Sequence, residues 1–140
     1  MNEIIVGFDQ LIGRTDISYG KDKIKCDFRD IEKIKTISAN YMVASGLSPD
    51  IERIDSKPVH AKNLLRFAVK LQESLKEFNK DNAILDFKFL LRVGFNVGEV
   101  VSGIIGTQKL LYDIWGDAVN ISSRMYPEIL KIQGYIFLSN

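Results

Sequence analysis

The sequence predicts an α+β fold in which helices cover a ferredoxin-like sheet. A long amphipathic helix is expected over residues 59–79, because apolar residues recur there at helical spacing while Lys and Glu fill the opposite face. Segments of alternating apolar and polar residues, typical of strands, lie on both sides of it. The expected order is helix, two strands, helix, two strands, helix and strand, which lacks only the leading strand of a β-α-β-β-α-β pattern.

The first third of the chain is expected to hold a short helix and two strands. Residues 1–12 place their apolar side chains on one helical face. The polar stretch 14–29, rich in lysine and aspartate, is predicted to be a surface loop. Two short strands are expected within residues 31–46, joined by a turn at 38–40. Residues 48–58 are predicted to be a loop because prolines punctuate both ends.

Shorter elements are expected after the long helix. A turn at Asn96 to Gly98 would join the first two strands into a hairpin, and Asp117 would cap the last helix. In chain order the elements are two strands, a short apolar segment, a helix and a final strand, at residues 87–95, 100–105, 112–115, 117–125 and 135–138.

Length and composition are typical of one globular domain spanning residues 1–140. Because the order of elements lacks the leading strand, this domain is expected to be cut short at both ends. Lys and Arg number 19 against 18 for Asp and Glu, so the charge predicts no nucleic-acid or membrane partner. No apolar run is long enough to cross a bilayer, and the N-terminus has no signal-peptide pattern. A single cysteine, Cys26, excludes an internal disulfide and fits a reducing cytosol.

Asn120 and Arg124 are candidates for phosphate contact. They are four residues apart in the last predicted helix, so their side chains point the same way from neighbouring turns. An amide donor beside a guanidinium suits a phosphate whose charge grows in a transition state. On spacing alone, however, an ordinary solvated helix face is the better explanation.

Lys35 and Asp113 are candidates for reading a purine base. Both lie among apolar residues in or beside predicted strands, where charges are unusual. Adenine presents an acceptor at N1 and a donor at its amino group, which suit a lysine and a carboxylate. Guanine reverses both, so such a pair would reject it. Without further context, an ordinary salt bridge is favoured.

Three other features are interpreted as structural. The glycines between Gly94 and Gly106 lack the spacing of a P-loop or dinucleotide fingerprint, so close backbone packing in a hairpin is preferred. His60, the single histidine, has no cysteine cluster near it, and a metal or catalytic-triad role is not expected. Acidic residues are interleaved with the lysines at residues 21, 23 and 25, as in a solvated loop.

Taken together, several stretches resemble the catalytic domains of class III nucleotide cyclases. The resemblance covers residues 1–125 and is strongest to the second cytoplasmic domain of animal membrane adenylate cyclases, with residues 107–117 closest to their type nine branch. The matching runs are residues 33–37 (KIKTI), 41–47 (YMVASGL), 91–96 (LRVGFN), 103–106 (GIIG) and 111–125 (LYDIWGDAVNISSRM). The last run is long and specific, and it reverses the preference for the structural explanations above.

The resemblance implies a truncated class III cyclase fold and a role for each candidate residue. Lys35 and Asp113 would bind adenine, Asn120 would orient the ribose and nucleotide, and Arg124 would stabilise charge at the α-phosphate. The ribose 3′-hydroxyl of ATP would attack that phosphate, giving cyclic AMP and pyrophosphate with the help of two magnesium ions. In this family the pocket forms between two domains, so a metal-bearing cyclase domain is the expected partner.

Departures from the family pattern bear on the metal. Ala39 stands where metal-binding halves carry an aspartate, and alanine cannot ligate magnesium. No metal ligand is therefore assigned to this chain, and both ions are expected on the partner domain. Ser38 replaces a usual glycine and Val97 a usual histidine, with no functional consequence assigned. Residues 126–140 depart from the family pattern.

Three rival functions remain. The first is a catalytically silent regulatory or pairing domain that kept the cyclase fold. The second is a guanylate cyclase, which would be expected to carry a glutamate and a small polar residue at the base-reading positions. The third is an RNA-binding module, against which the neutral charge and the missing aromatic motif argue. The family further implies a cytosolic domain of a plasma-membrane protein, with G-protein subunits as additional partners.

Overall fold

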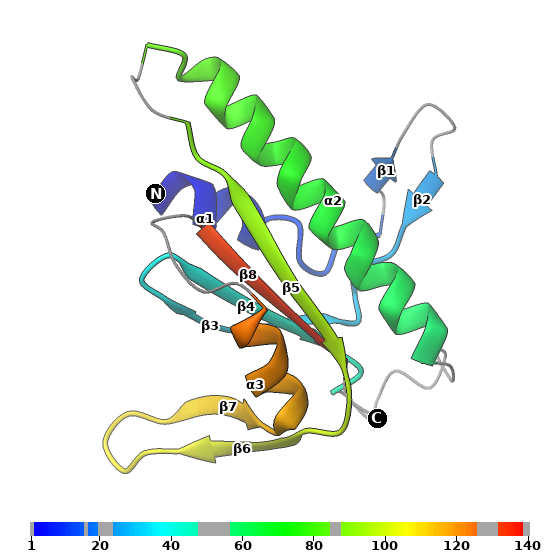
Figure 1. Ribbon diagram of the computed structural model, residues 1–140, viewed down its shortest axis with the longest axis vertical. Helices are drawn as coiled ribbons and strands as arrows, with labels where there is room; N and C mark the ends of the chain where they lie inside the picture. The colour runs from blue at the N-terminus through cyan, green and yellow to red at the C-terminus, as the bar shows by residue number, and fades with distance from the viewer. Residues whose placement is uncertain are drawn as a thin grey trace.

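A four-stranded mixed sheet forms the centre of the computed structural model, which describes residues 2–15, 17–19, 24–47, 57–84, 88–125 and 132–138 (Figure 1). β3 and β4 are antiparallel, whereas β8 runs parallel to both of its neighbours. The sheet has the strand order β3-β4-β8-β5, with bounds Ile31–Ile37, Asn40–Ser45, Ile132–Leu138 and Leu91–Val97. The predicted α+β class is confirmed.

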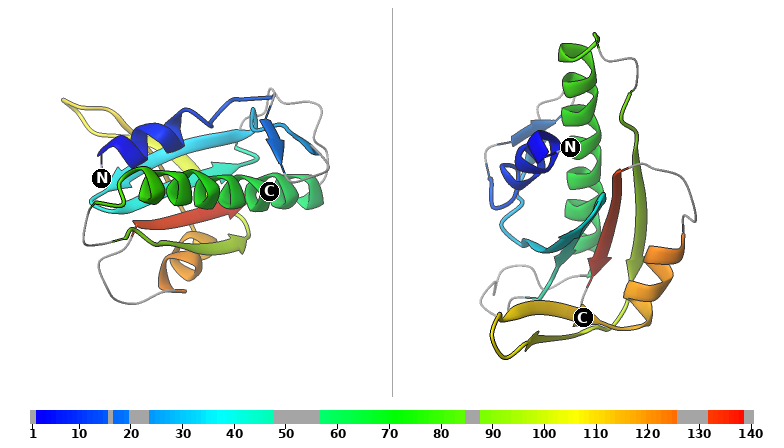
Figure 2. Two further views of the ribbon diagram at one scale, coloured as in Figure 1. Left: turned by 90° about the horizontal axis from the view of Figure 1, so that it is seen from above. Right: turned by 90° about the vertical axis from the view of Figure 1, so that its left-hand side faces the viewer.

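In the described part of the chain, three helices and two small hairpins surround this sheet. α2 is the long predicted helix and runs along the direction of β8 and β5, with α1 beside it (Figures 1 and 2). The helices α1, α2 and α3 span Asn2–Asp9, Lys57–Asp81 and Asp117–Arg124. The hairpins pair β1 with β2, at Ile17–Tyr19 and Ile24–Cys26, and β6 with β7, at Val101–Ile105 and Leu111–Trp115.

One face of the sheet, which we call the α1–α2 face, packs against α1 and α2. Helical spacing brings the apolar stripe of α2 onto the sheet, as the sequence predicted. Phe67 of α2 meets the ring of Phe28 edge to face at 5.2 Å, and Phe8 of α1 meets Tyr41 in the same way at 5.5 Å. The buried residues of this core are Ile4, Phe8, Cys26, Phe28, Ile31, Tyr41, Val43, Leu64, Phe67, Ala68, Leu71, Leu75 and Leu91.

The opposite face, which we call the α3 face, carries a smaller core. Met42 and Ala44 of β4 pack there with Ile114 of β7 and with Val119 of α3. Because successive side chains of a strand point to opposite faces, β4 contributes Tyr41 and Val43 to the first core and Met42 and Ala44 to the second. Residues 41–45 are accordingly all buried.

β8 occupies a central position between two parallel strands. β4, α2 and β5 form a crossover whose two strands are not adjacent, and β8 pairs with both of them. A final strand at 135–138 was predicted, and it is confirmed with a start three residues earlier, at Ile132.

Three predicted details are wrong. The stretch 14–29 is more than a surface loop, since it forms the β1–β2 hairpin and buries Cys26 and Phe28. The turn after β5 does not make a hairpin with β6, which pairs with β7 instead. Asp117 is the first residue of α3 and makes no side-chain cap, because Gly116 holds the cap position. Its carboxylate still suits the positive end of the helix dipole.

Other boundaries differ by a few residues. The strand expected at 87–95 begins at Leu91, and residue 87 lies outside the described part of the chain. Most of the loop expected at 48–58 also lies outside it, while Pro58 belongs to the first turn of α2, where a proline is tolerated.

The turn between β3 and β4 contains a strained residue. Ser38 has φ 54°, in the left-handed region that favours glycine. This geometry gives a physical reason for the glycine that the family pattern has at this position.

We expect Ser38→Gly to stabilise the fold by about 1 kcal/mol, because the left-handed strain disappears. Urea unfolding followed by circular dichroism would measure the change. Ser102→Gly, in the exposed part of β6, is the matched control and should destabilise by about 0.5 kcal/mol. A loss of stability in both variants would contradict the strain at Ser38.

Candidate active site

A β-bulge in β3 sends two nearby lysines to opposite faces of the sheet. Lys33 pairs with Val43 and Lys35 with Met42, so Ile34 is an extra residue in β3. Val43 belongs to the α1–α2 face and Met42 to the α3 face. Without the bulge, strict alternation would place Lys35 on the same face as Lys33.

On the α3 face, Lys35 reaches Asp113. Its Nζ lies 2.6 Å from Asp113 Oδ2, across 78 residues of sequence. The Lys35 side chain is 34% exposed and that of Asp113 only 15%, so the pair is partly shielded from water. Asp113 Oδ1 also accepts a hydrogen bond from the backbone N–H of Ile114 at 2.9 Å, which orients the carboxylate. The two predicted base-reading residues are therefore in direct contact.

On the opposite face, Lys33 has a structural role. Its Nζ lies 2.6 Å from Asp9 Oδ2 at the end of α1, and Tyr41 Oη donates to Asp9 Oδ1 at 2.7 Å. Burial, reinforced by the neighbouring Asp9 carboxylate, raises the pKa of the Tyr41 phenol well above its usual range, so the hydroxyl remains a donor. These contacts hold α1 against the sheet.

Asn120 and Arg124 lie on α3, which is separated from β7 by the single residue Gly116. Ala118 and Ser122 form the buried side of this helix, whereas Asn120 and Arg124 are exposed on successive turns. Within the described ranges, neither of these two side chains makes a hydrogen bond or an ion pair. An amide and a cation are therefore available to a ligand, next to the strand that carries Asp113.

His60 belongs to a buried polar cluster with Asp30 and Ser45. Ser45 Oγ lies 2.5 Å from Asp30 Oδ2 and 2.7 Å from His60 Nδ1, and Nδ1 also lies 3.0 Å from Asp30 Oδ2. A catalytic triad needs the histidine to bridge acid and nucleophile through two different nitrogens. Here both contacts use Nδ1, and Ser45 is fully buried. The cluster joins α2 to the sheet and does not have the geometry of a hydrolase site.

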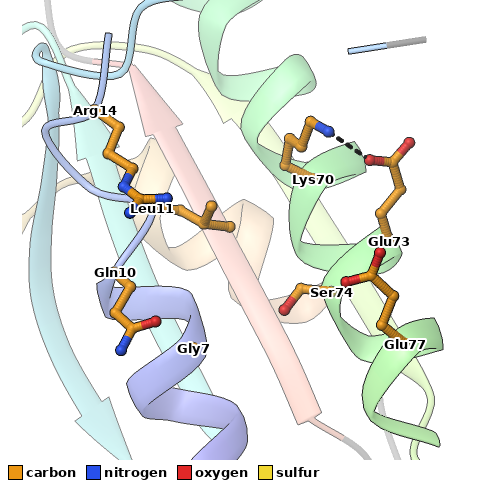
Figure 3. A pocket seen from close by; sticks show the side chains of 8 residues that line it. All are labelled: Gly7, Gln10, Leu11, Arg14, Lys70, Glu73, Ser74 and Glu77. Atoms are coloured by element: carbon orange, nitrogen blue, oxygen red, sulfur yellow. Dashed lines mark hydrogen bonds and ion pairs between the residues drawn. The ribbon is translucent and has the colours of Figure 1, made fainter. Parts of the chain in front are cut away.

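A cavity of about 340 Å³ lies between α1 and α2, away from the candidate residues (Figure 3). Arg14 and Gln10 line one side, and Ser74 lies opposite them on α2 (Figure 3). Lys70 in its wall is paired with Glu73 at 2.7 Å. None of Lys35, Asp113, Asn120 and Arg124 lines this cavity.

The candidate site does not fit a magnesium ion. Its carboxylate, Asp113, is engaged by the Lys35 cation, and Ala39 in the β3–β4 turn offers no side-chain oxygen. Across the described residues, no three His, Cys, Asp or Glu side chains gather into a group that could hold a metal.

Sequence reasoning missed the bulge at Ile34, which aims Lys35 at Asp113. Period-2 alternation carries no signal for an inserted residue, since Lys33 and Lys35 look equivalent in the pattern. Only the pairing of β3 with β4 shows that they face opposite ways.

We expect Lys35→Met to lower the free energy of unfolding by about 1–2 kcal/mol, because it leaves the shielded Asp113 carboxylate without its cation. The double variant Lys35→Met/Asp113→Asn should lose less than the sum of the two single variants. Denaturant titration of all four proteins measures this coupling. Arg29→Met removes an exposed ion pair with Asp27 and is the control, with an unchanged midpoint. Additive losses would show that the two side chains do not interact.

The described part of the chain contains no helix long and apolar enough to cross a membrane.

Comparison with known proteins finds similarity to adenylate cyclase type 9 of Xenopus laevis, 48% identical over 126 residues, and of Gallus gallus, 45% identical over the same length. Both alignments cover 89% of this chain but only 9% and 8% of the relatives. An adenylate cyclase of Mycobacterium bovis is 36% identical over 101 residues, which is 71% of this chain and 20% of the relative.

The family model described as the adenylate and guanylate cyclase catalytic domain matches residues 1–136, nearly the whole chain. The matched region contains the helices α1 to α3 and all four candidate residues. The chain therefore belongs to the adenylate and guanylate cyclase catalytic domain family, and within the class III cyclases it is similar to type 9.

Proposed function

We propose that this chain is the metal-free half of an adenylate cyclase catalytic core, converting ATP to cyclic AMP and pyrophosphate when paired with a second cyclase domain. Residues 1–140 would form part of one such catalytic domain. Lys35 and Asp113 would bind adenine, and Asn120 and Arg124 would act on the ribose and phosphate.

The contact between Lys35 and Asp113 carries this proposal. A cation and a carboxylate held 2.6 Å apart and partly shielded present one donor and one acceptor side by side. Adenine N1 accepts from an ammonium, and the adenine amino group donates to a carboxylate, so the pair matches the adenine edge. Guanine has a donor at N1 and a carbonyl at C6, and it would leave both charged groups mismatched.

Arg124 and Asn120 supply the chemistry at phosphorus. The 3′-oxygen of the ribose forms a bond to the α-phosphorus and releases its proton to solvent. The bond to the bridging oxygen of pyrophosphate breaks, and pyrophosphate leaves with the bonding electron pair. Negative charge grows on the phosphate oxygens in the transition state. A guanidinium beside them therefore stabilises the transition state more than the ground state. Asn120, one turn earlier on the same exposed side of α3, would donate to the ribose and orient the 3′-hydroxyl.

An exposed apolar surface on the β6–β7 hairpin supports pairing with another domain. Two cross-strand pairs, Val101 with Trp115 and Ile105 with Leu111, lie on one face of the hairpin. Their side chains are 71%, 41%, 47% and 52% exposed. Large apolar patches of this kind are typical of protein interfaces. We propose a metal-bearing cyclase domain as the partner, which would hold the Mg²⁺ ions.

The regulatory setting is part of the same proposal and rests on the family resemblance alone. The chain would be a cytosolic domain of a plasma-membrane protein, and G-protein subunits would be additional partners. Both ideas go beyond the geometry of this chain.

The test is to mix the chain with a metal-bearing cyclase domain and assay ATP and GTP separately with Mg²⁺. We expect cyclic AMP only from the mixture. Arg124→Ala should lower kcat by about 10²-fold, as expected for loss of one transition-state contact. Lys35→Ala should mainly raise KM for ATP and narrow the preference over GTP. Arg29→Ala and Lys62→Ala, at exposed positions away from α3 and β7, are the controls and should keep full activity.

Two outcomes would contradict the proposal. Cyclic AMP production that is unaffected by Arg124→Ala would remove α3 from the chemistry. Demonstrated pairing with no product from either nucleotide would favour the catalytically silent regulatory domain instead.

A further inference from the structure

We propose that Gly94, Asn96 and Gly98, which we call the contact strip, set the position of α3 and thereby the reach of Asn120 and Arg124. These are positioning residues, since they act through α3. The inference rests on the proposed function for its catalytic consequence, but its geometry stands independently. Gly94 and Asn96 alternate in β5 and so share the α3 face, while Leu91, Val93 and Phe95 face α1 and α2. Gly98 follows the last residue of β5 and lies against Ala118 of α3.

Both glycines are required for space. A Cβ built on Gly94 would lie 2.2 Å from the backbone oxygen of Ser122, and one built on Gly98 would lie 2.9 Å from the Ala118 Cβ. Real Cβ atoms do not approach other atoms so closely. Neither glycine is among the residues with positive φ, so the backbone conformation would tolerate a side chain. The limit on both positions is therefore the close approach of α3.

Asn96 adds a polar contact between the two glycines. Its Nδ2 donates to the carbonyl oxygen of Ala118 at 3.4 Å, and its Oδ1 accepts from the backbone N–H of Val97 at 2.9 Å. The second contact fixes the amide orientation that the first requires. The strip thus contacts α3 at Ala118 and Ser122, one helical turn apart.

The same helix carries the phosphate-contacting residues on its other side. α3 has only eight residues, and Ser122 Oγ donates to the carbonyl oxygens of Ala118 and Val119, which ties its two turns together. A shift of the buried side of so short a helix moves the exposed side with it. Displacement of a catalytic group by about 1 Å can cost on the order of 10²-fold in rate.

The two glycines offer different tests because their neighbours differ. The contact at Gly94 is with the backbone oxygen of Ser122, an atom that no substitution removes. The contact at Gly98 is with the Ala118 side chain, which Ala118→Gly removes. Gly98→Ala should therefore push α3 away, and Gly98→Ala/Ala118→Gly should let it return.

The experiment measures kcat and KM for ATP of the chain paired with a metal-bearing cyclase domain, together with backbone amide chemical shifts of α3. In Gly98→Ala we expect kcat to fall by about 10²-fold while KM changes less than about threefold, because Lys35 and Asp113 lie outside α3. The double variant should restore most of kcat. Gly7→Ala is the matched control, since its Cβ would meet Ser74 Oγ at an ordinary 3.7 Å.

A second variant covers the case in which Gly98→Ala does not fold. Asn96→Asp keeps the size and the acceptor for Val97 but loses the donor to Ala118, and it should lower kcat by about tenfold. If the strip had a merely structural role, the variants would lower the thermal stability and the active fraction of the protein. They would not lower kcat while leaving KM nearly unchanged.

The outcomes separate the two proposals. If the unmodified pair makes no cyclic AMP, the proposed function fails, and the strip is then judged by the amide shifts. Shifts that move throughout α3 in Gly98→Ala and return in the double variant support it. Three results would overturn the positioning role of the contact strip. One is a folded Gly98→Ala variant whose α3 amide shifts are unchanged, and another is an active pair in which Gly98→Ala leaves kcat unaltered. The third is a double variant that restores neither the amide shifts nor kcat.

Discussion

The burial of β4 on both faces is the constraint on which the rest of the structure depends. Its residues 41–45 are all buried, so the strand needs apolar cover from two directions at once. α1 and α2 provide that cover on one face, and β7 and α3 on the other. The second face is the one that bears the candidate site. The small core of Met42, Ala44 and Ile114 therefore brings β7, with Asp113, next to β3.

The bulge at Ile34 resolves a conflict that this two-sided burial creates. Lys33 and Lys35 are two residues apart, and regular alternation would point both toward α1. One extra residue lets Lys33 meet Asp9 while Lys35 meets Asp113. The same strand thus holds α1 in place with one lysine and presents the other to the site. The sheet thus separates the ion pair that holds α1 from the ion pair of the candidate site.

Sequence reasoning succeeded where a signal repeats and failed where it rests on one residue. The helical stripe of α2 repeats over seven turns, and its prediction was confirmed to within two residues at each end. The three-residue strands β1 and β2 are too short to show alternation, and 14–29 was taken for a loop. The Asn96–Gly98 turn signal was misread, because these residues accommodate α3 rather than close a hairpin.

The candidate site shows the same division. Spacing alone placed Asn120 and Arg124 on one side of a helix, which the structure confirms. The contact between Lys35 and Asp113 could not be derived from local pattern, because it joins strands 78 residues apart and depends on the bulge. Residue types alone favoured an ordinary salt bridge between them, and the base-reading role came only from the family resemblance; the structure shows the contact itself.

That geometry also bears on how selectivity for adenine would arise. In the free chain Lys35 and Asp113 satisfy each other, so neither charge is left unpaired while the site waits for a ligand. A base must replace part of this contact. The lost ion-pair contact is compensated only by a base that places an acceptor against the ammonium and a donor against the carboxylate. A mismatched base would separate the pair and leave both charges unmatched, which costs more than the absence of a contact. On the proposed function, a guanine held in the adenine pose would set its N1–H against the ammonium and its C6 carbonyl against the carboxylate, so discrimination would come from rejection as much as from binding.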